Sequence, residues 1–381
     1  MLITDFSYFY PINFFTKSSM LLQQIALTLL PGVGNVTGKK LIAYCGGVEA
    51  VFKQKREALE KIPGIGEKLI NSILNHFVFR QAEKEIAFIE KNNITPLFYL
   101  DKNYPELLKN CDDGPILLYY KGTASLNVSR IISIVGTRKA TDYGKMICEK
   151  LVKDLAEYNV LVISGLAYGI DTCAHHSALD NHLNTIAVLG HGLDRIYPHL
   201  NRNLATKIID HGGLLSEFMS GTLPDRENFP QRNRIIAGMA DATVVIEAAK
   251  SGGALITADM ANSYNREVFT IPGRIGDTWS EGCNLLIRDN KAALIQSATD
   301  IAKMMGWEKK KQNVKQHLLF VNLTPDEKKI ISLMRGNGEM GIDEITLQSR
   351  LNMSKVAAAL LNLEFNGIVK ALPGKIYKFI G

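Results

Sequence analysis

The sequence predicts an α/β fold: a mostly parallel, doubly wound sheet between an all-helical region and a small C-terminal unit of helices and a β wing. Three observations predict this fold class. Residues 86–305 alternate short β-branched runs with helical patterns. Residues 20–85 are helical throughout, and residues 321–381 show three helices followed by two short strands. A length of 381 residues with 46% apolar side chains suits several domains with packed cores.

The first 19 residues are rich in aromatic side chains. They lack the basic start and the small-residue cleavage site of a signal peptide, and Met20 offers an alternative start. We therefore expect residues 1–19 to form an N-terminal extension without a defined fold.

The helical region contains a repeated turn, Leu30–Gly34 ("LPGVG") and Ile62–Gly66 ("IPGIG"). In a helix-hairpin-helix unit, two glycines allow a tight turn, and the free amides of the next helix can hold a nucleic-acid phosphate. The same turns would also serve as plain connections in a small pseudo-symmetric bundle. The sequence leaves both interpretations open.

The central region contains apolar runs that suit a parallel sheet covered on both faces. The expected strands are Ile131–Val135, Val160–Ser164, Thr185–Leu189, Gly213–Ser216, Thr243–Glu247, Val268–Ile271 and Ala293–Ile295. Ligands of such sheets bind outside the carboxyl ends of the strands, so the functional residues should follow them.

A lysine-rich linker over residues 306–320 separates this region from the C-terminal unit. In that unit Thr324 can cap a helix with Pro325 in its first turn, and the order of helices, strand, Pro-Gly turn and strand is a winged-helix plan. The candidate recognition helix offers Lys355 as its one cation, opposed by Glu364. That favours a role in protein interaction or dimer support over reading of duplex DNA.

Charge and cysteine usage narrow the class of protein. The formal net charge of +6 is modest, so a polyanionic partner must meet a local basic surface. The five cysteines are widely spaced without a C-x-x-C pair, which indicates reduced thiols in the cytoplasm and argues against structural zinc. No apolar run is long enough to span a membrane.

The stretch "IVGTRKATDYG", residues 134–144, has the strand-turn-helix pattern of a phosphate cradle. It matches neither the dinucleotide motif G-x-G-x-x-G nor the P-loop. Glycines that allow close backbone approach recur beside cations after several strands, and Arg138, Arg232 and Arg234 would suit several phosphates along a chain. Alternatively, Arg138 would pair with Asp142 or Asp171 and brace the turn.

Enzymatic alternatives have weaker support. Asp171, His175 and His176 suggest a metal or acid-base site, but spacing places no third ligand, and we favour a bracing role for them. The serines lack a nucleophile elbow. A phosphoribohydrolase that removes a base from a nucleotide would need a glutamate after a P-G-G-x-G-T loop. Glu247 ends an expected strand without that loop, so this is the second-ranked hypothesis.

The chain resembles the DNA-processing protein A family of bacterial recombination mediators, also called DprA or Smf, over residues 20–381. The resemblance is carried by "GTRKATDYG", "ISGLAYGIDTCAHHSAL", "LGHGLDRIYPHLN", "FPQRNRIIAGMADATVVIEA", "SGGALITA" and "GCNLLIRD". It implies an extended Rossmann-like domain that binds single-stranded DNA, forms a homodimer and helps to load the RecA recombinase in natural transformation. It implies no enzymatic activity and no cofactor.

The resemblance also implies a set of DNA-binding residues. Arg138 of the G-[ST]-R turn would face the phosphate backbone, and His199 stands where the family pattern leads us to expect a lysine, so Arg195 and Arg202 would supply charge nearby. The full expected set is Gly136, Thr137, Arg138, Lys139, Gly165, Ala167, Gly169, Arg195, His199, Asn201, Arg202, Arg232, Asn233, Arg234, Ser251 and Gly252.

Overall fold

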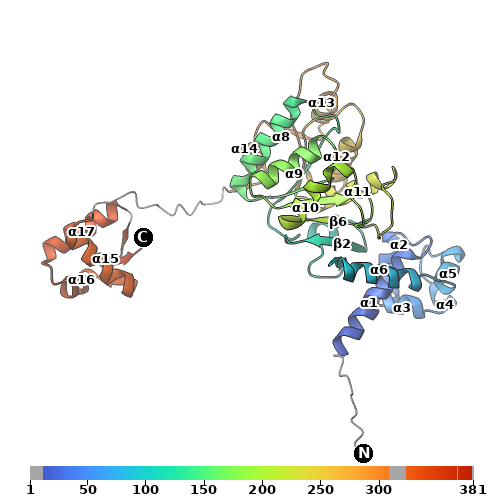
Figure 1. Cartoon of the computed structure of the whole chain (residues 1–381), viewed down its shortest axis with the longest axis horizontal. Coiled ribbons are helices and arrows are strands. Elements are labelled where there is room, and N and C mark those ends of the chain that lie inside the picture. The colour runs from blue at the N-terminus through green and yellow to red at the C-terminus, as the bar shows by residue number, and fades with distance from the viewer. Residues whose placement is uncertain (1–11, 309–322, 367, 380–381) are drawn as a thin grey trace, which may run out of the picture. The chain divides into compact units, whose positions relative to one another are not determined.

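The computed structural model describes residues 12–308, 323–366 and 368–379 (Figure 1). The chain divides into two compact units, residues 1–310 and 311–381. Residues 1–11 of the expected extension and 309–320 of the expected linker lie outside the described residues. Helix α1 begins at Ile12, inside the expected extension. No described helix is long and apolar enough to cross a membrane.

The N-terminal part of the first unit is helical, as predicted. Its helices are α1 (Ile12–Leu29), α2 (Asn35–Cys45), α3 (Val48–Lys53), α4 (Arg56–Leu59), α5 (Glu67–Leu74) and α6 (Phe79–Lys91). The two repeated turns precede α2 and α5, and Gly32 and Gly64 adopt positive φ values of 82° and 76° that glycine tolerates best. The Lys40 side chain of α2 donates to the carbonyl of Pro63 at 3.0 Å, which joins the two hairpins.

The α/β part contains a nine-stranded sheet in the order β1-β2-β6-β5-β4-β3-β7-β8-β9. The strands are β1 (Thr95–Phe98), β2 (Leu117–Gly122), β3 (Ile131–Val135), β4 (Leu161–Ser164), β5 (Thr185–Leu189), β6 (Gly212–Ser216), β7 (Ala242–Val245), β8 (Glu267–Thr270) and β9 (Ala293–Leu294). The strands from β3 to β9 are parallel, which confirms the predicted fold class. The antiparallel strands β1 and β2 were not predicted.

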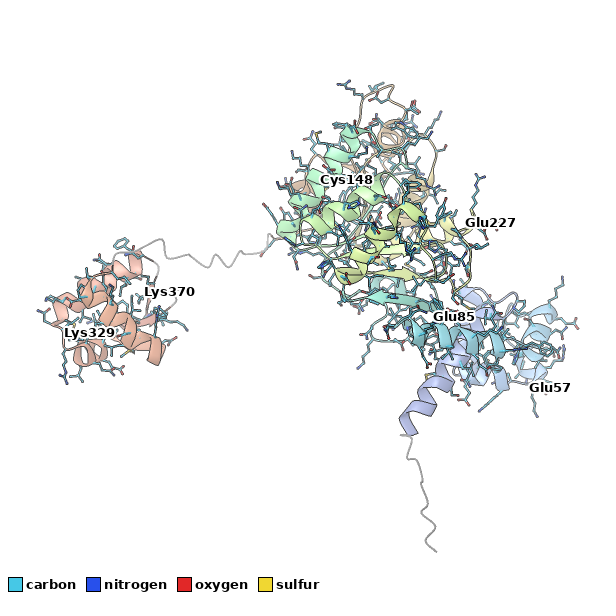
Figure 2. The ribbon with its side chains drawn as sticks, in the orientation of Figure 1. Glu57, Glu85, Cys148, Glu227, Lys329 and Lys370 are labelled. Carbon is cyan, nitrogen blue, oxygen red and sulfur yellow. The ribbon has the colours of Figure 1, made fainter. Side chains whose placement is uncertain are left out.

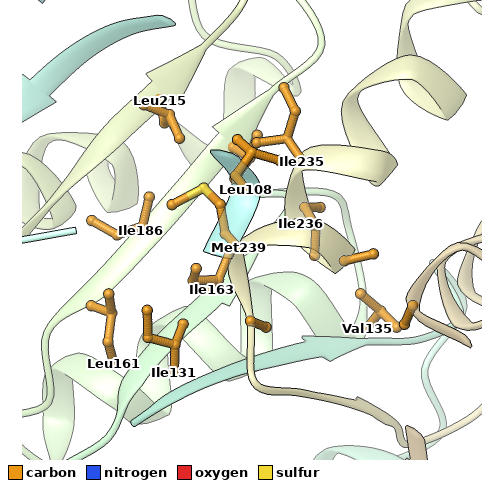
Figure 3. Close-up of a cluster of buried hydrophobic side chains, with 14 of the residues drawn as sticks. Leu108, Ile131, Val135, Leu161, Ile163, Ile186, Leu215, Ile235, Ile236 and Met239 are labelled. Carbon is orange, nitrogen blue, oxygen red and sulfur yellow. The ribbon is translucent and has the colours of Figure 1, made fainter. Parts of the chain in front are cut away.

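Helices cover both faces of the sheet. They are α7 (Glu106–Lys109), α8 (Asp142–Leu155), α9 (Ile170–Asp180), α10 (Arg202–Asp210), α11 (Asn228–Met239), α12 (Gly253–Ser263), α13 (Glu281–Arg288) and α14 (Ala298–Met304). Neighbouring residues of β3 show the two-sided burial. Ile131 shares a cluster with residues of α12 and of α11, whose Met239 is drawn with it in Figure 3. Ile132 shares a cluster with residues of α8 and α9. Cys148 of α8, labelled in Figure 2, is buried on this second face.

The helical region packs on the antiparallel edge of the sheet. Leu118 and Tyr120 of β2 belong to the core of the α/β part, whereas Leu117 and Tyr119 belong to the core of the helical region. Strand β2 is therefore shared by two hydrophobic cores.

The second unit has the predicted winged-helix plan. It contains α15 (Pro325–Asn337), β10 (Glu339–Gly341), α16 (Ile342–Ser349), α17 (Met353–Phe365), β11 (Val369–Leu372) and β12 (Ile376–Phe379), with the strands in the order β10-β12-β11. Thr324 caps α15 as expected, in a reciprocal capping box with Glu327. Lys355 of α17 lies 3.9 Å from Asp326, and the outward-facing Leu361 and Phe365 are 54% and 84% exposed.

Candidate nucleic-acid interface

A pocket of about 780 Å³ opens where the order of the sheet reverses. Strand β3 lies between β4 and β7, so the loops that follow β3 and β7 leave in opposite directions and open a crevice at the carboxyl ends of the strands. The structure brings nine of the expected site residues to the lining of this pocket: Gly136, Thr137, Arg138, Lys139, Ala167, Arg232, Asn233, Ser251 and Gly252.

The loop after β3 fits closely against the loop after β4. A Cβ atom on Gly136 would come within 2.5 Å of the Ile170 side chain, and one on Gly169 within 2.2 Å of the carbonyl oxygen of Thr137. Gly169 also has a φ of +79°, which a larger residue adopts with strain. These glycines let the two backbones touch and hold the Thr137–Lys139 tip at the pocket rim.

Glu247, after β7, braces the same loop from the other side. Its side chain is 5% exposed, and it accepts hydrogen bonds from the Thr141 N–H at 3.0 Å and the Thr141 hydroxyl at 2.5 Å, one on each carboxylate oxygen. The Thr141 hydroxyl in turn accepts from the Gly144 N–H and caps α8. These contacts explain Glu247 as a structural brace, so they do not favour the phosphoribohydrolase hypothesis.

The rim carries two exposed cations beside aromatic rings. The Arg138 guanidinium carbon lies 5.3 Å from the centre of the Phe229 ring, and the Lys139 ammonium lies 5.9 Å from that of Trp279. Asp142 pairs with Lys145 at 3.2 Å rather than with Arg138. Across the described ranges, neither rim cation forms an ion pair. The structure therefore does not support internal bracing by Arg138.

The floor of the pocket holds the buried Arg232. This side chain is 4% exposed, and its Nη1 donates to the carbonyl oxygens of Gly165 at 2.5 Å and Val188 at 2.6 Å. Burial lowers the pKa of Arg232 to about 10, while nearby Asp171 counters the shift, so the guanidinium stays charged at neutral pH. A Cβ atom on Gly165 would lie 2.1 Å from Arg232 Nη1, which explains the glycine.

Asp171, which is part of the lining, and His175 come from α9 beside this floor. Asp171 accepts hydrogen bonds from the N–H groups of Gly165 at 3.2 Å and Ala167 at 3.4 Å, and burial raises its pKa. His175 Nδ1 lies 2.7 Å from the Thr185 hydroxyl, and burial lowers its pKa to about 3, so the ring is neutral. Within the described ranges, no three His, Cys, Asp or Glu side chains are grouped to hold a metal ion. Asp171 therefore braces the loop after β4, and His175 braces the start of β5.

The N-terminus of α12 forms another part of the lining. Ser251 and Gly252 are exposed, Gly252 occupies the cap position, and no side chain caps the helix. The Asn233 side chain donates to the carbonyl of Gly253 at 3.3 Å and fixes the start of the helix. Uncapped N–H groups at a helix start attract phosphate groups.

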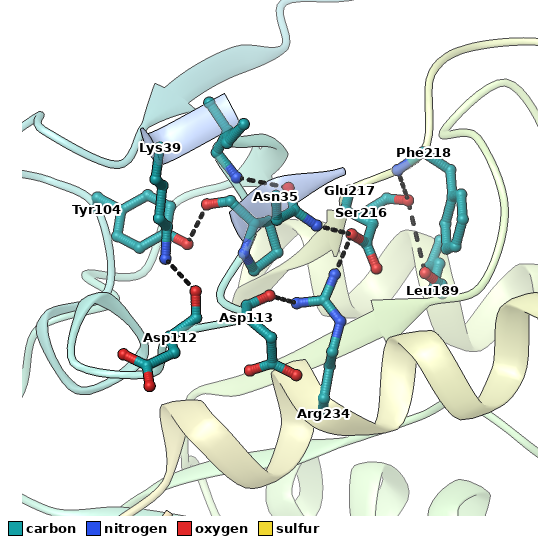
Figure 4. Close-up of polar contacts among 12 residues, drawn as sticks. Asn35, Lys39, Tyr104, Asp112, Asp113, Leu189, Ser216, Glu217, Phe218 and Arg234 are labelled. Atoms are coloured by element: carbon teal, nitrogen blue, oxygen red, sulfur yellow. Dashed lines mark hydrogen bonds and ion pairs between the residues drawn. The ribbon is translucent and has the colours of Figure 1, made fainter. Parts of the chain in front are cut away.

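Arg234 is not part of the pocket lining. Its guanidinium ion-pairs with Glu217 and donates to the Asp113 carbonyl at 2.6 Å, and Asn35 of the helical region lies 3.5 Å from the same carboxylate (Figure 4). The Arg234 and Glu217 side chains are each 10% exposed. Arg234 therefore joins the helical region to α11 in this structure.

Four other expected residues lie on the segment after β5. Asn201 is buried and donates to the Leu166 carbonyl at 2.9 Å, so it supports the loop after β4. Arg195 donates to Asp194, with Nη2 2.6 Å from the carboxylate. His199 and Arg202 are exposed and outside the lining, although Tyr197 is part of it.

Several lining residues were not predicted: Tyr197, Arg226, Phe229 and Trp279. Phe229 and Tyr197 stand inside motifs quoted from the sequence, and their ring centres lie 6.0 Å apart. The sequence signal that could have identified these positions is the presence of aromatic residues interleaved with cations. The lining thus combines the cations Arg138, Lys139, Arg226 and Arg232 with one carboxylate, Asp171.

Three family models match the chain. They are DNA recombination-mediator protein A over residues 95–306, the DprA winged helix domain over 321–375 and the SAM-like helix-hairpin-helix tandem over 25–77. The first covers more than half of the chain. The chain belongs to the DNA recombination-mediator protein A family. One relative matches almost its whole length: protein Smf of Synechocystis is 34% identical over 93% of this chain and 97% of its own.

Other members extend the comparison. DNA processing protein DprA of Streptococcus pneumoniae is 43% identical over 53% of this chain and 71% of its own. An X-ray structure of that protein matches with a TM-score of 0.62 and 32% identity, covering 78% of this chain and 98% of its own. A structure of the Helicobacter pylori protein, described as showing a unique single-stranded DNA binding mode, matches with a TM-score of 0.52 and 28% identity over 56% of this chain and 97% of its own.

Proposed function

We propose that the pocket binds the phosphate backbone of single-stranded DNA and that no bond is made or broken there. The observation that carries the proposal is the rim: Arg138 and Lys139 are exposed, without an ion-pair partner in the described ranges, and set beside aromatic rings. Phosphates attract the cations, while Trp279 and Tyr197 offer faces on which unpaired bases stack. The single-stranded DNA binding mode described for the Helicobacter pylori relative supports the same ligand.

The expected site residues divide into direct contacts and supports. Direct contacts come from the rim and the α12 N-terminus: Gly136, Thr137, Arg138, Lys139, Ala167, Ser251 and Gly252. The residues Gly165, Gly169, Asn201, Arg232 and Asn233 hold those groups in position. Arg195, His199 and Arg202 would contact a DNA strand that continues past Tyr197. Arg234 holds α11 in place from outside the pocket.

We further propose that the bound strand is delivered to the RecA recombinase in the cytoplasm, with a homodimer as the working form. Membership of a recombination-mediator family supports this role. Helix α17 exposes apolar side chains, and its cation Lys355 lies close to Asp326. A surface with apolar groups and a partnered cation suits a protein better than DNA, so we propose that the winged-helix unit takes part in protein interaction. We propose no enzymatic step, since Glu247 is engaged by Thr141 on both oxygens.

The test compares oligo-dT with duplex DNA in fluorescence anisotropy, with and without RecA. We expect tighter binding of the single strand, little dependence on its sequence, and an affinity that falls with salt at a log-log slope near −0.7 per neutralised phosphate. Equal affinity for duplex and single strand would overturn the proposal. Steady release of free base from nucleoside monophosphates would replace it with the phosphoribohydrolase alternative.

A further inference from the structure

A second cleft, of about 590 Å³, lies between the helical region and the α/β part, near the Glu85 label in Figure 2. One wall is formed by Phe77, Arg80, Gln81, Lys84 and Glu85, and the other by Met219 and Ser220. Phe77 is 94% exposed. Single exposed apolar side chains are common on protein surfaces, so the exposure of Phe77 indicates a binding site only if the surrounding groups also favour one.

The turn that carries Phe77 is held by its neighbours. His76 and Phe79 pack edge to face with ring centres 4.9 Å apart, and both contact Phe52 of α3, at 5.1 Å and 5.2 Å. Because the residues on either side of the turn are anchored in this aromatic cluster, the Phe77 ring is presented outward from a fixed backbone. The backbone beneath the ring therefore loses little conformational entropy when a ligand stacks on it.

The charges of the cleft favour an anion. Arg80 and Lys84 are exposed and, in the described part of the chain, form no ion pair. Glu85 is the one carboxylate among the described lining residues, and it is 3% exposed. Its oxygens accept from the Ser220 N–H at 3.0 and 3.2 Å and from the Ser220 hydroxyl. Glu85 thereby fixes the opposite wall, and with two cations against one carboxylate the described lining keeps a net positive charge.

One short segment connects this cleft with the pocket. Met219 and Ser220 line the cleft, and Pro224 and Arg226, a few residues later, line the pocket. An extended chain covers at most about 3.6 Å per residue, so the two sites lie within the length of a short oligonucleotide. Exposed aromatic rings beside unpaired cations are the combination that single strands use, by base stacking and phosphate contact.

We propose that this cleft binds a second stretch of the single strand held by the pocket, with a base stacked on Phe77 and phosphates on Arg80 and Lys84. The inference rests on the proposed function of the pocket. It predicts that the cleft contributes only when the strand is long enough to reach both sites.

The experiment measures anisotropy of oligo-dT of about 6 and about 25 nucleotides with the wild type, Phe77→Ala and the double variant Arg80→Ala/Lys84→Ala. We expect each variant to lose about fivefold or more in affinity for the long strand, Phe77→Ala through the lost stacking contact and the double variant through the lost phosphate contacts, and none for the short one. Tyr44→Ala is the matched control, because Tyr44 is a 60% exposed aromatic residue of the same region outside the cleft.

Phe77→Trp gives a second readout. Long strands should quench its fluorescence beyond the change that the wild-type protein shows, and short strands should not. Wild-type affinity of Phe77→Ala and of the double variant for the long strand overturns the inference and leaves the cleft to a protein partner. If Arg138→Ala is still impaired in that case, the proposed function stands. If the wild type binds neither strand, the proposed function itself fails.

Discussion

The rim and the floor of the pocket carry the same residue type in opposite settings. Arg138 on the rim is exposed, with its guanidinium over the Phe229 ring. Arg232 on the floor lies 5.9 Å from the same ring, yet it is 4% exposed and donates to two backbone carbonyl groups. The comparison teaches that burial separates a cation that can meet a ligand from one that shapes the site. The following predictions test that division.

The largest effect is expected at the floor. Arg232→Ala removes the hydrogen bonds to the carbonyl groups of Gly165 and Val188, and it removes the nearby charge that opposes the rise in the pKa of the buried Asp171. A buried acceptor that loses its donor costs roughly 1–3 kcal/mol of stability, and this substitution affects two of them. Urea denaturation should show this loss. If Arg232→Ala kept wild-type stability and lost only DNA affinity, the floor would be a contact surface and the comparison would fail.

The rim should respond in the opposite way. Arg138→Ala should keep the wild-type melting temperature and lose about ten- to a hundredfold in single-strand affinity, because a charge-assisted hydrogen bond is worth roughly 1.5–3 kcal/mol. Arg138→Lys should recover part of that affinity, since the charge returns without the fork. Anisotropy over a salt series measures both variants. A stable Arg138→Ala protein with wild-type affinity for oligo-dT contradicts the proposed role.

The third effect is a pH dependence of stability that comes from the buried His175. The pKa of His175 is lowered to about 3 in the folded protein, against about 6.5 in an unfolded chain. Below pH 6.5 the unfolded state therefore binds one more proton at this site, and stability falls as the pH falls. Between pH 7 and 5.5 this group should cost about 1.3 kcal/mol.

Urea denaturation of His175→Gln should show a pH dependence smaller by about that amount, whatever its stability at pH 7. The comparison uses the difference between two pH values within each protein, so a general destabilisation by the substitution cancels. Identical pH dependence in the two proteins would show that His175 is accessible to protons in the folded state.

The smallest effect is expected from the second unit. Removal of residues 321–381 should lower single-strand affinity by less than tenfold, or about 1.4 kcal/mol, because α17 presents apolar side chains rather than a set of cations. Anisotropy with oligo-dT checks this expectation. A larger loss would assign part of the DNA contact to the winged-helix unit.

The sequence predicted the parallel strands well, for a physical reason. The runs Ile131–Val135 and Thr185–Leu189 match β3 and β5 residue for residue, because strands buried on both faces are continuously apolar. Strand β1 was missed: it is four residues long and contains Pro96, and such strands occur at sheet edges without a strong pattern.

The site was predicted in outline but not in its internal division. Gly136 and Arg138 follow a predicted strand, and this pattern predicted part of a ligand site, because ligands bind at the carboxyl ends of parallel strands. Arg232 and Arg234 stand two residues apart on α11, and both are cations inside the same quoted motif. Only the packing of α11 between the sheet and the helical region places them in different buried networks, and no local pattern encodes that packing.

The double role of β2 has a practical consequence for anyone dissecting this protein. Leu117 and Tyr119 are 3% and 2% exposed in the intact chain because the helical region covers them, together with Phe98 of β1. A truncated chain that starts near residue 93 would present these side chains to water as a continuous apolar strip along a sheet edge. Such edges recruit other chains. We therefore expect that fragment to be recovered as aggregates, and that binding studies of the pocket require the helical region to be retained.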